Sequence, residues 1–170
     1  MLDKGFLISM AFLRLGKNNE YNDNKSLEYK IANKLIDHVF YNLAKDTSYL
    51  FNSTTVTLTL FKPDTNVIGE YRANVPNDLL NVIRADKPIR LEGEFIYSND
   101  KEINLQYCRA IDISDTPDYL ADLLIYTLCR EMCLAFNSYY DRLGYFEQKI
   151  QEERLKIIAN QFNNFNFPVK

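Results

Sequence analysis

The chain has 170 residues and a mass of 20.0 kDa, with 46% hydrophobic and 25% charged residues, which is typical of one soluble globular domain and excludes a disordered or fibrous chain. Its 20 basic and 23 acidic residues give a net charge of −3, which argues against a protein that coats nucleic acid through a basic stripe. One histidine, five glycines and no tryptophan leave little for acid–base chemistry or phosphate-cradling loops, so the composition disfavours an enzyme.

The three cysteines, Cys108, Cys129 and Cys133, lack the spacing of a disulfide framework and predict a reducing compartment. Residues 5–13 loosely resemble a signal-peptide core, but they lack a small-residue cleavage site and run into Arg14. No apolar run approaches the ~20 residues that span a bilayer. We therefore expect synthesis in the cytoplasm and no membrane partner.

The first third of the chain predicts two helices. Residues 2–15 form a short amphipathic segment that ends at Gly16, a suitable C-cap. After a polar loop, residues 26–44 carry apolar side chains at helical spacing on one face.

The middle third, residues 53–107, changes to the alternating pattern of a small antiparallel sheet. A first strand covers 53–61 and a second covers 67–75, while Pro76 begins a bend or helical turn that reaches Ile83. A hairpin follows, bent near Gly93, with its turn at 98–100. Glu92 and Glu94 flank Gly93 and are expected on one side of a strand, where solvated carboxylates are the ordinary interpretation.

The last third predicts two more helices, over 117–137 and 139–160. Thr116 provides an N-cap hydroxyl and Pro117 occupies the first helical position. The first of these helices is the most core-like in the chain, and residues 161–170 are expected to be an extended C-terminal arm. The predicted fold class is α+β and mainly helical, with one domain over residues 1–160.

We find no phosphate-binding loop, dinucleotide fingerprint or nucleophile elbow, and we assign no catalytic, cofactor-binding or metal-binding residue. Cys108, Cys129, Cys133 and His38 are the candidates for a zinc site. Zinc sites usually show close cysteine pairs, which this sequence lacks, and packing of cysteine as a small hydrophobe explains the same residues. Zinc therefore remains the weaker alternative.

Three features are candidate interaction surfaces. The last predicted helix has only a thin apolar stripe, which consists of Leu143, Phe146, Ile150 and Ile157. This stripe is too thin to hold the helix well on a single monomer, which favours packing against a neighbouring subunit. The C-terminal tail has three phenylalanines in polar surroundings, which favour docking on a partner: Phe162, Phe165 and Phe167. An acidic series is a candidate for facing passing DNA: Asp112, Asp115, Asp118 and Asp122. Helix capping also explains Asp115 and Asp118.

The order of these segments carries a family resemblance between Leu7 and Asn160. Tyr71, Val75, Pro76 and Asp78 match an aromatic-x-x-x-aliphatic-Pro-x-Asp pattern, followed by hairpin segments 91–99 and 103–107 and by a helix that opens over 112–120. The chain thus resembles the head-to-tail adaptor family of tailed bacteriophages, which includes tail tubular protein A of short-tailed phages. The family's Gly-Trp after the second helix is absent, and Tyr49 or Phe51 fills the aromatic role. The asparagine-rich, tryptophan-free composition is similar to that of crAss-like phages.

The resemblance implies a homo-oligomeric ring of about twelve copies that binds the portal protein and offers a docking surface to a downstream tail or nozzle protein. Such a ring extends the channel through which double-stranded DNA passes without being held, and its net acidic charge suits that passage. The resemblance also implies a place at the head–tail junction of the virion and a docking role for residues 161–170. Two alternatives stay open: a neck or tail-completion protein of a long-tailed phage, and a small zinc-containing binding module or hydrolase.

Overall fold

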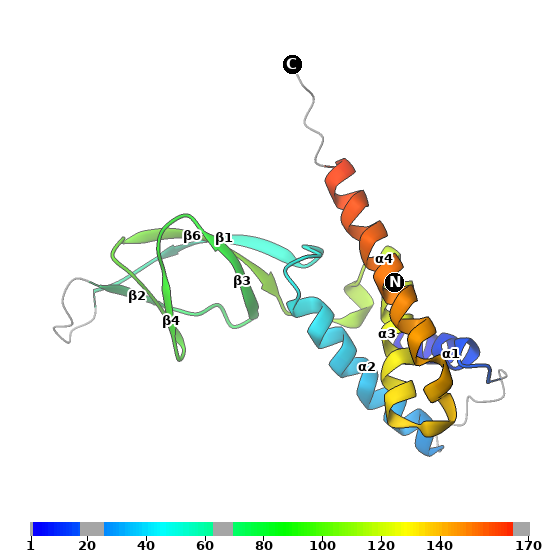
Figure 1. Ribbon diagram of the computed structural model, residues 1–170. Coiled ribbons are helices and arrows are strands. Elements are labelled where there is room, and N and C mark those ends of the chain that lie inside the picture. Colours follow the sequence, from blue (N-terminus) through cyan, green and yellow to red (C-terminus); the bar gives the residue numbers. More distant parts are fainter. Residues whose placement is uncertain (1, 18–25, 63–69, 165–170) are drawn as a thin grey trace. The chain divides into compact units, whose positions relative to one another are not determined.

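The computed structural model describes residues 2–17, 26–62 and 70–164, with side chains up to residue 160. The chain divides into two compact units. The helical unit contains both ends, Met1–Leu43 and Asp112–Lys170, and the β unit, Ala44–Ile111, is inserted between them. The predicted α+β fold class is confirmed, and Figure 1 shows the described helices and strands, most of them labelled.

The helical unit contains α1 (Lys4–Arg14), α2 (Leu27–Lys45), α3 (Ala121–Ala135) and α4 (Leu143–Asn164), and the last residues of α2 enter the β unit. Short 3-10 helices precede α3, over Ile113–Asp115 and Asp118–Leu120, and one joins α3 to α4, over Asn137–Arg142. The chain between 117 and 121 is therefore a tight turn, and the α-helix begins four residues later than the sequence predicted.

α1 ends at Gly16 as its sequence predicts, but it begins at Lys4, two residues later than predicted. The Asp3 carboxylate caps the helix by accepting the amide of Phe6 at 3.0 Å. At the other end Gly16 has φ +79°, and the amide of Lys17 donates to the carbonyl of Phe12 at 2.9 Å. This is the glycine-terminated C-cap in which a left-handed residue satisfies the last carbonyls. A Cβ at Gly16 would also lie 2.9 Å from the Arg142 guanidinium.

The core of the helical unit lies around α3, which packs against both α1 and α4. The thiol of Cys129 donates to the carbonyl of Ala11 at 3.5 Å, which shows how closely α3 approaches α1. The fully buried large side chains of the unit come from all four helices and the turn before α3: Leu7, Ile8, Ile36, Leu120, Leu124, Leu128, Met132 and Phe146. Burying such side chains contributes about 1.5–3 kcal/mol each.

The described residues of the β unit form two antiparallel sheets of three strands each. One has the order β1-β6-β3, from β1 (Ser53–Thr59), β6 (Glu102–Arg109) and β3 (Leu79–Ala85); the other has the order β2-β5-β4, from β2 (Tyr71–Asn74), β5 (Phe95–Ser98) and β4 (Arg90–Glu92). Alternate residues of both sheets form one core: Leu60, Ile96, Ile103, Leu105 and Tyr107. Val56 and Leu58, which alternate with threonines along β1, pack against this core.

Two details of the predicted sheet are wrong. The bend expected from Pro76 to Ile83 is mostly the strand β3, whose pairing with β6 shifts register between Leu79 and Asn81 and between Val82 and Arg84. These register shifts are typical of β-bulges, which interrupt the alternation of inward and outward side chains by which a strand is recognised in a sequence.

The predicted hairpin turn at residues 98–100 instead joins β5 to β6, which belong to different sheets. The hairpin turn is at Gly93, with φ +59°, where Glu92 pairs with Phe95 across two turn residues. Glu94 is therefore in a turn, and the carboxylates of Glu92 and Glu94 do not project from one continuous strand.

Candidate interaction surfaces

The apolar stripe of α4 is buried within the helical unit. Phe146 is 0% exposed and Ile150 and Ile157 are each 4% exposed, while Leu143 is half-buried. The rings of Phe146 and Tyr126 on α3 lie 6.4 Å apart between centroids. The prediction that this stripe packs against a neighbouring subunit is therefore wrong, because its side chains are already buried or half-buried within a single chain.

The outer side of α4 has other apolar side chains. Tyr145 is 52% exposed and Leu155 is 68% exposed. Charged side chains between them form ion pairs along the helix, including Lys149 with Glu152 at 2.7 Å and Lys156 with Glu153 at 2.6 Å. Both pairs join residues three positions apart along the helix. Such exposed pairs contribute little to stability.

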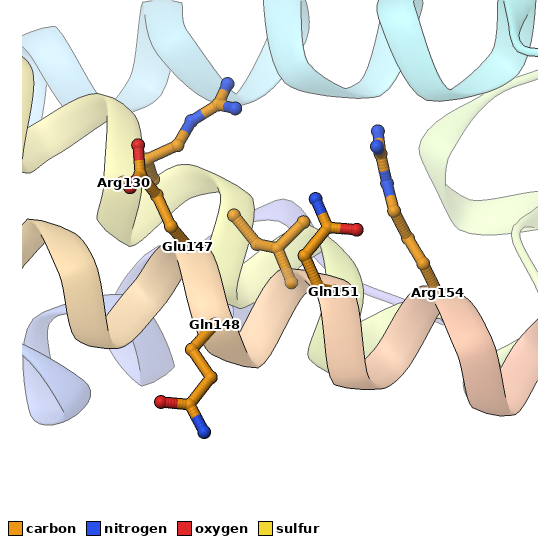
Figure 2. A pocket seen from close by; sticks show the side chains of 6 residues that line it. Arg130, Glu147, Gln148, Gln151 and Arg154 are labelled. Carbon is orange, nitrogen blue, oxygen red and sulfur yellow. The ribbon is translucent and has the colours of Figure 1, made fainter.

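A polar groove of about 350 Å³ lies where α3 meets α4. Arg130 comes from α3, and the other lining residues come from α4: Glu147, Gln148, Ile150, Gln151 and Arg154. Figure 2 shows Arg130, Gln151 and Arg154 extending to one side of α4, and Gln148 to the other. The Arg130 guanidinium is already bonded to Glu131 at 3.1 Å. Guanidinium and carboxamide groups over a buried isoleucine suit a polar side chain of a partner protein.

Sequence reasoning missed this groove. The signal was present, since Glu147, Gln151 and Arg154 recur at helical spacing on one face of α4. Arg130 could not be added from sequence alone, because its position beside that face depends on how α3 packs against α4.

The four aspartates of the acidic series are all exposed. Asp115 and Asp118 lie in the first turns of the two 3-10 helices before α3, and Asp122 lies in the first turn of α3. Asp122 is 3.4 Å from the Arg14 guanidinium, so its charge is partly offset. The expected channel-facing role of Asp112, Asp115, Asp118 and Asp122 stays a prediction.

The capping role expected of Thr116 is wrong. Thr116 is 3% exposed, and its hydroxyl oxygen has no hydrogen-bond partner among the described residues. Pro117, with an extended backbone, stands at the N-cap of the following 3-10 helix. The tight turns before α3 move Thr116 away from the first α-helical turn.

The cysteines are free and buried, Cys108 on β6 and Cys129 and Cys133 on α3. Burial raises the pKa of the Cys129 thiol far above its ordinary value, and burial also raises the pKa of Cys133 and Cys108. His38 is exposed on α2 and bonds the Asn42 carboxamide at 2.9 Å. Within the described part of the chain, no three histidine, cysteine or acidic residues come together as a metal-holding group.

The helix α4 continues to Asn164, four residues into the segment expected to be extended. The predicted end of the last helix at residue 160 is therefore four residues too early. The candidate docking residues Phe165 and Phe167, and the side chain of Phe162, lie outside the described residues. Their partner-docking role stays a prediction.

The β unit presents arginine and aromatic side chains that the sequence reading did not single out. The Arg72 guanidinium stacks 4.7 Å from the Phe95 ring centroid, and that of Arg90 stacks 4.5 Å from the Tyr97 centroid. Phe61, paired with Arg72 at the edge of the same sheet, is 71% exposed. The alternation of Phe95 and Tyr97 was visible in the sequence, but their arginine partners come from other strands.

No protein-family model matches this chain, and no curated protein matches it. None of the described helices combines the length and apolar character that crossing a membrane requires.

Proposed function

We propose that this chain is a structural virion protein, a subunit of a head-to-tail adaptor ring that joins the portal to the tail and extends the DNA ejection channel. The observation that carries the proposal is the order of the elements. Two helices, a β-rich insertion and two further helices follow one another as the resemblance implies, with both ends of the chain in one helical unit.

The surface supports a role in assembly. Large apolar side chains are more than half exposed in both units, including Leu155 and Leu134 in the helical unit and Phe61 in the β unit. Protein interfaces are built around such side chains, with polar residues at their rims. The buried thiols, whose pKa values are raised, are poor nucleophiles, which fits a non-catalytic role.

The exposed aspartates before α3 support a place beside moving DNA. A wall with carboxylates repels phosphates and releases DNA quickly, whereas a basic wall would hold it. We propose that Asp112, Asp115 and Asp118 face the channel in the assembled ring and that the segment 161–170 docks on a neighbouring component. The partners are further copies of the chain, the portal protein and a tail or nozzle protein.

The test is reconstitution with the portal protein, observed by electron microscopy. We expect a ring of about twelve copies beneath the portal, with the aspartates on its inner wall. A protein that stays monomeric beside the portal, or a particle that attaches its tail normally without this chain, would overturn the adaptor proposal. A ring found below the neck of a long-tailed particle would instead identify a neck or tail-completion protein.

A second test concerns the C-terminal segment. Deleting residues 161–170 should abolish tail attachment while the truncated chain still folds, as judged by circular dichroism. Full tail attachment by the truncated protein would remove that segment from the proposal.

A further inference from the structure

The four outer strands of the two sheets differ in how well they are protected against pairing with another chain. An unpaired edge strand offers free amides and carbonyls, and proteins usually blunt such edges with bulges, charges, prolines or short length. β3 has two register shifts and ends beside the exposed Arg84. β4 has three residues and two charged side chains, and β2 has four residues and is bridged by Phe61.

β1 has none of these protections. Its seven residues, Ser-Thr-Thr-Val-Thr-Leu-Thr, contain no charge, proline or glycine, and they pair with β6 in one unbroken register. Threonine, valine and leucine in alternation favour an extended strand. Among the described strands of the β unit, β1 thus has the longest regular edge.

The hydrogen bonds of β1 show which groups are free. The Leu60 amide donates to the Lys101 carbonyl at 2.8 Å, and the Arg109 amide donates to the Asn52 carbonyl at 3.1 Å. In this antiparallel register, even-numbered residues of β1 therefore bond to β6, and odd-numbered residues direct their amides and carbonyls away from it. The outward groups belong to Thr55, Thr57 and Thr59, which are all exposed.

We propose that the free edge of β1 receives the C-terminal segment 165–170 of a second copy as an added strand. In that segment, Phe-Asn-Phe-Pro-Val-Lys, apolar residues alternate with polar residues and proline. The half-buried Val56 and Leu58 lie on the core side of β1, and the threonines lie on the solvent side. A strand with the same alternation can cover the apolar side without burying polar groups.

The proline selects a parallel pairing. With Asn166 opposite Thr57, the Thr57 amide donates to the carbonyl of residue 165, and its carbonyl accepts the amide of residue 167. Pro168 then lies opposite Thr59 and need not donate. Phe165, Phe167 and Val169 fall on the core side, beside Val56 and Leu58. An antiparallel pairing would either require an amide from Pro168 or place the phenylalanines on the threonine side.

The added strand would also end the sheet. Its new outer edge presents Asn166, Pro168 and Lys170, and proline and lysine are residues that block further pairing. Each copy would give one tail and receive one, which is a heterologous contact that closes into a ring. As a statement about the ring, this inference rests on the proposed function. As a contact between two copies, it is testable without portal or tail proteins, so its failure leaves the adaptor proposal standing.

The experiment mixes two full-length variants, Thr57→Cys and Asn166→Cys, and treats them with a short bis-maleimide. Because each variant has only one of the two new thiols, a link between positions 57 and 166 can form only between copies. We expect that link as the main covalent dimer, identified by mass spectrometry, in many-fold excess over a matched mixture of Arg84→Cys and Asn166→Cys. A predominant 57-to-57 link would show that β1 pairs with β1 and would overturn the proposal, as would equal linking at position 84.

The second experiment places a charged side chain on the free edge of β1 and measures association between copies. Thr57→Lys should abolish most of the association between copies seen by sedimentation, with an unchanged circular dichroism spectrum. It also removes the hydrogen bond that the Thr57 hydroxyl donates to the Asn104 carboxamide at 2.7 Å, a bond that the control variant Asn104→Lys removes as well. Asn104→Lys, on the adjacent strand β6 and directly opposite Thr57, adds the same charge away from the edge and should leave association intact. Equal association of Thr57→Lys and the parent protein would contradict strand addition.

Discussion

The two long helices that pack together, α3 and α4, differ in how much of their surface the fold covers. Eight residues of α3 are buried, whereas the buried side chains of α4, up to residue 160, are Phe146, Ile150 and Ile157. The thin stripe of α4 suggested a helix completed by another subunit. It is instead the inner face of an outer helix, so a narrow stripe is enough when its few side chains are large and fully covered.

The variant Phe146→Ala is the strongest test of whether the narrow stripe of α4 is as well buried as the core of α3. Removing a fully buried phenylalanine should lower the free energy of unfolding by about 3–5 kcal/mol, close to the about 2–5 kcal/mol expected for Leu128→Ala on α3. Urea unfolding of both variants, at a concentration where the chain is monomeric, measures the two losses. A negligible change in the free energy of unfolding for Phe146→Ala would contradict burial of the α4 stripe within one chain and would favour the sequence-based prediction that it packs against another subunit.

The burial of Cys129 on α3 should make the stability of the protein depend on pH in the alkaline range. Burial raises the pKa of Cys129 above the ordinary value of 9.0, so the folded state keeps its proton more tightly than the unfolded state. The stabilisation is complete below pH 9.0 and declines as the pH rises above it, by about 1.4 kcal/mol per pH unit. The free energy of unfolding between pH 8 and pH 11 (roughly the range where thiols titrate) should fall more steeply for the parent than for Cys129→Ala. If the free energy of unfolding falls equally with pH in the parent and in Cys129→Ala, the prediction that Cys129 keeps its proton more tightly in the folded state is contradicted.

A smaller effect is expected where α3 meets α1. The Arg14 guanidinium donates to the Tyr126 hydroxyl at 2.9 Å and lies 5.0 Å from the centre of its ring. Tyr126→Phe keeps the ring and removes the hydrogen bond, which should cost about 0.5–1.5 kcal/mol in urea unfolding. Tyr145→Phe on the exposed side of α4 is the matched control and should leave the free energy of unfolding nearly unchanged.

The smallest effect is expected at Leu155. This side chain is 68% exposed, so Leu155→Gln should change the free energy of unfolding by no more than about 0.5 kcal/mol. Ile157→Gln, two residues along the same helix, buries an amide in place of a 4% exposed apolar side chain and should be strongly destabilising. Similar thermal midpoints for the two variants would show that α4 is not oriented as described.

The sequence predicted the elements well where the period is regular. The sequence predicted that α3 is the most core-like helix, and Gly16 predicted the end of α1. It failed where local order is broken, as in the bulged strand β3, or where one-turn helices replace the expected start of a longer helix, as at Thr116. The groove at Arg130 and the stacking of Arg72 on Phe95 depend on contacts between distant segments, which periodicity does not encode.

The Asn52 carboxamide joins the two ends of the β unit, because it donates to the carbonyl of Ala44 at 2.8 Å and to that of Arg109 at 2.7 Å. An insertion whose entry and exit are tied together acts on the rest of the chain as a short loop would. The β unit is therefore a cassette that evolution or an engineer can lengthen, trim or exchange between Ala44 and Arg109. The helices on either side keep their own core through such an exchange, and Asn52 is the residue that a transplanted cassette should retain.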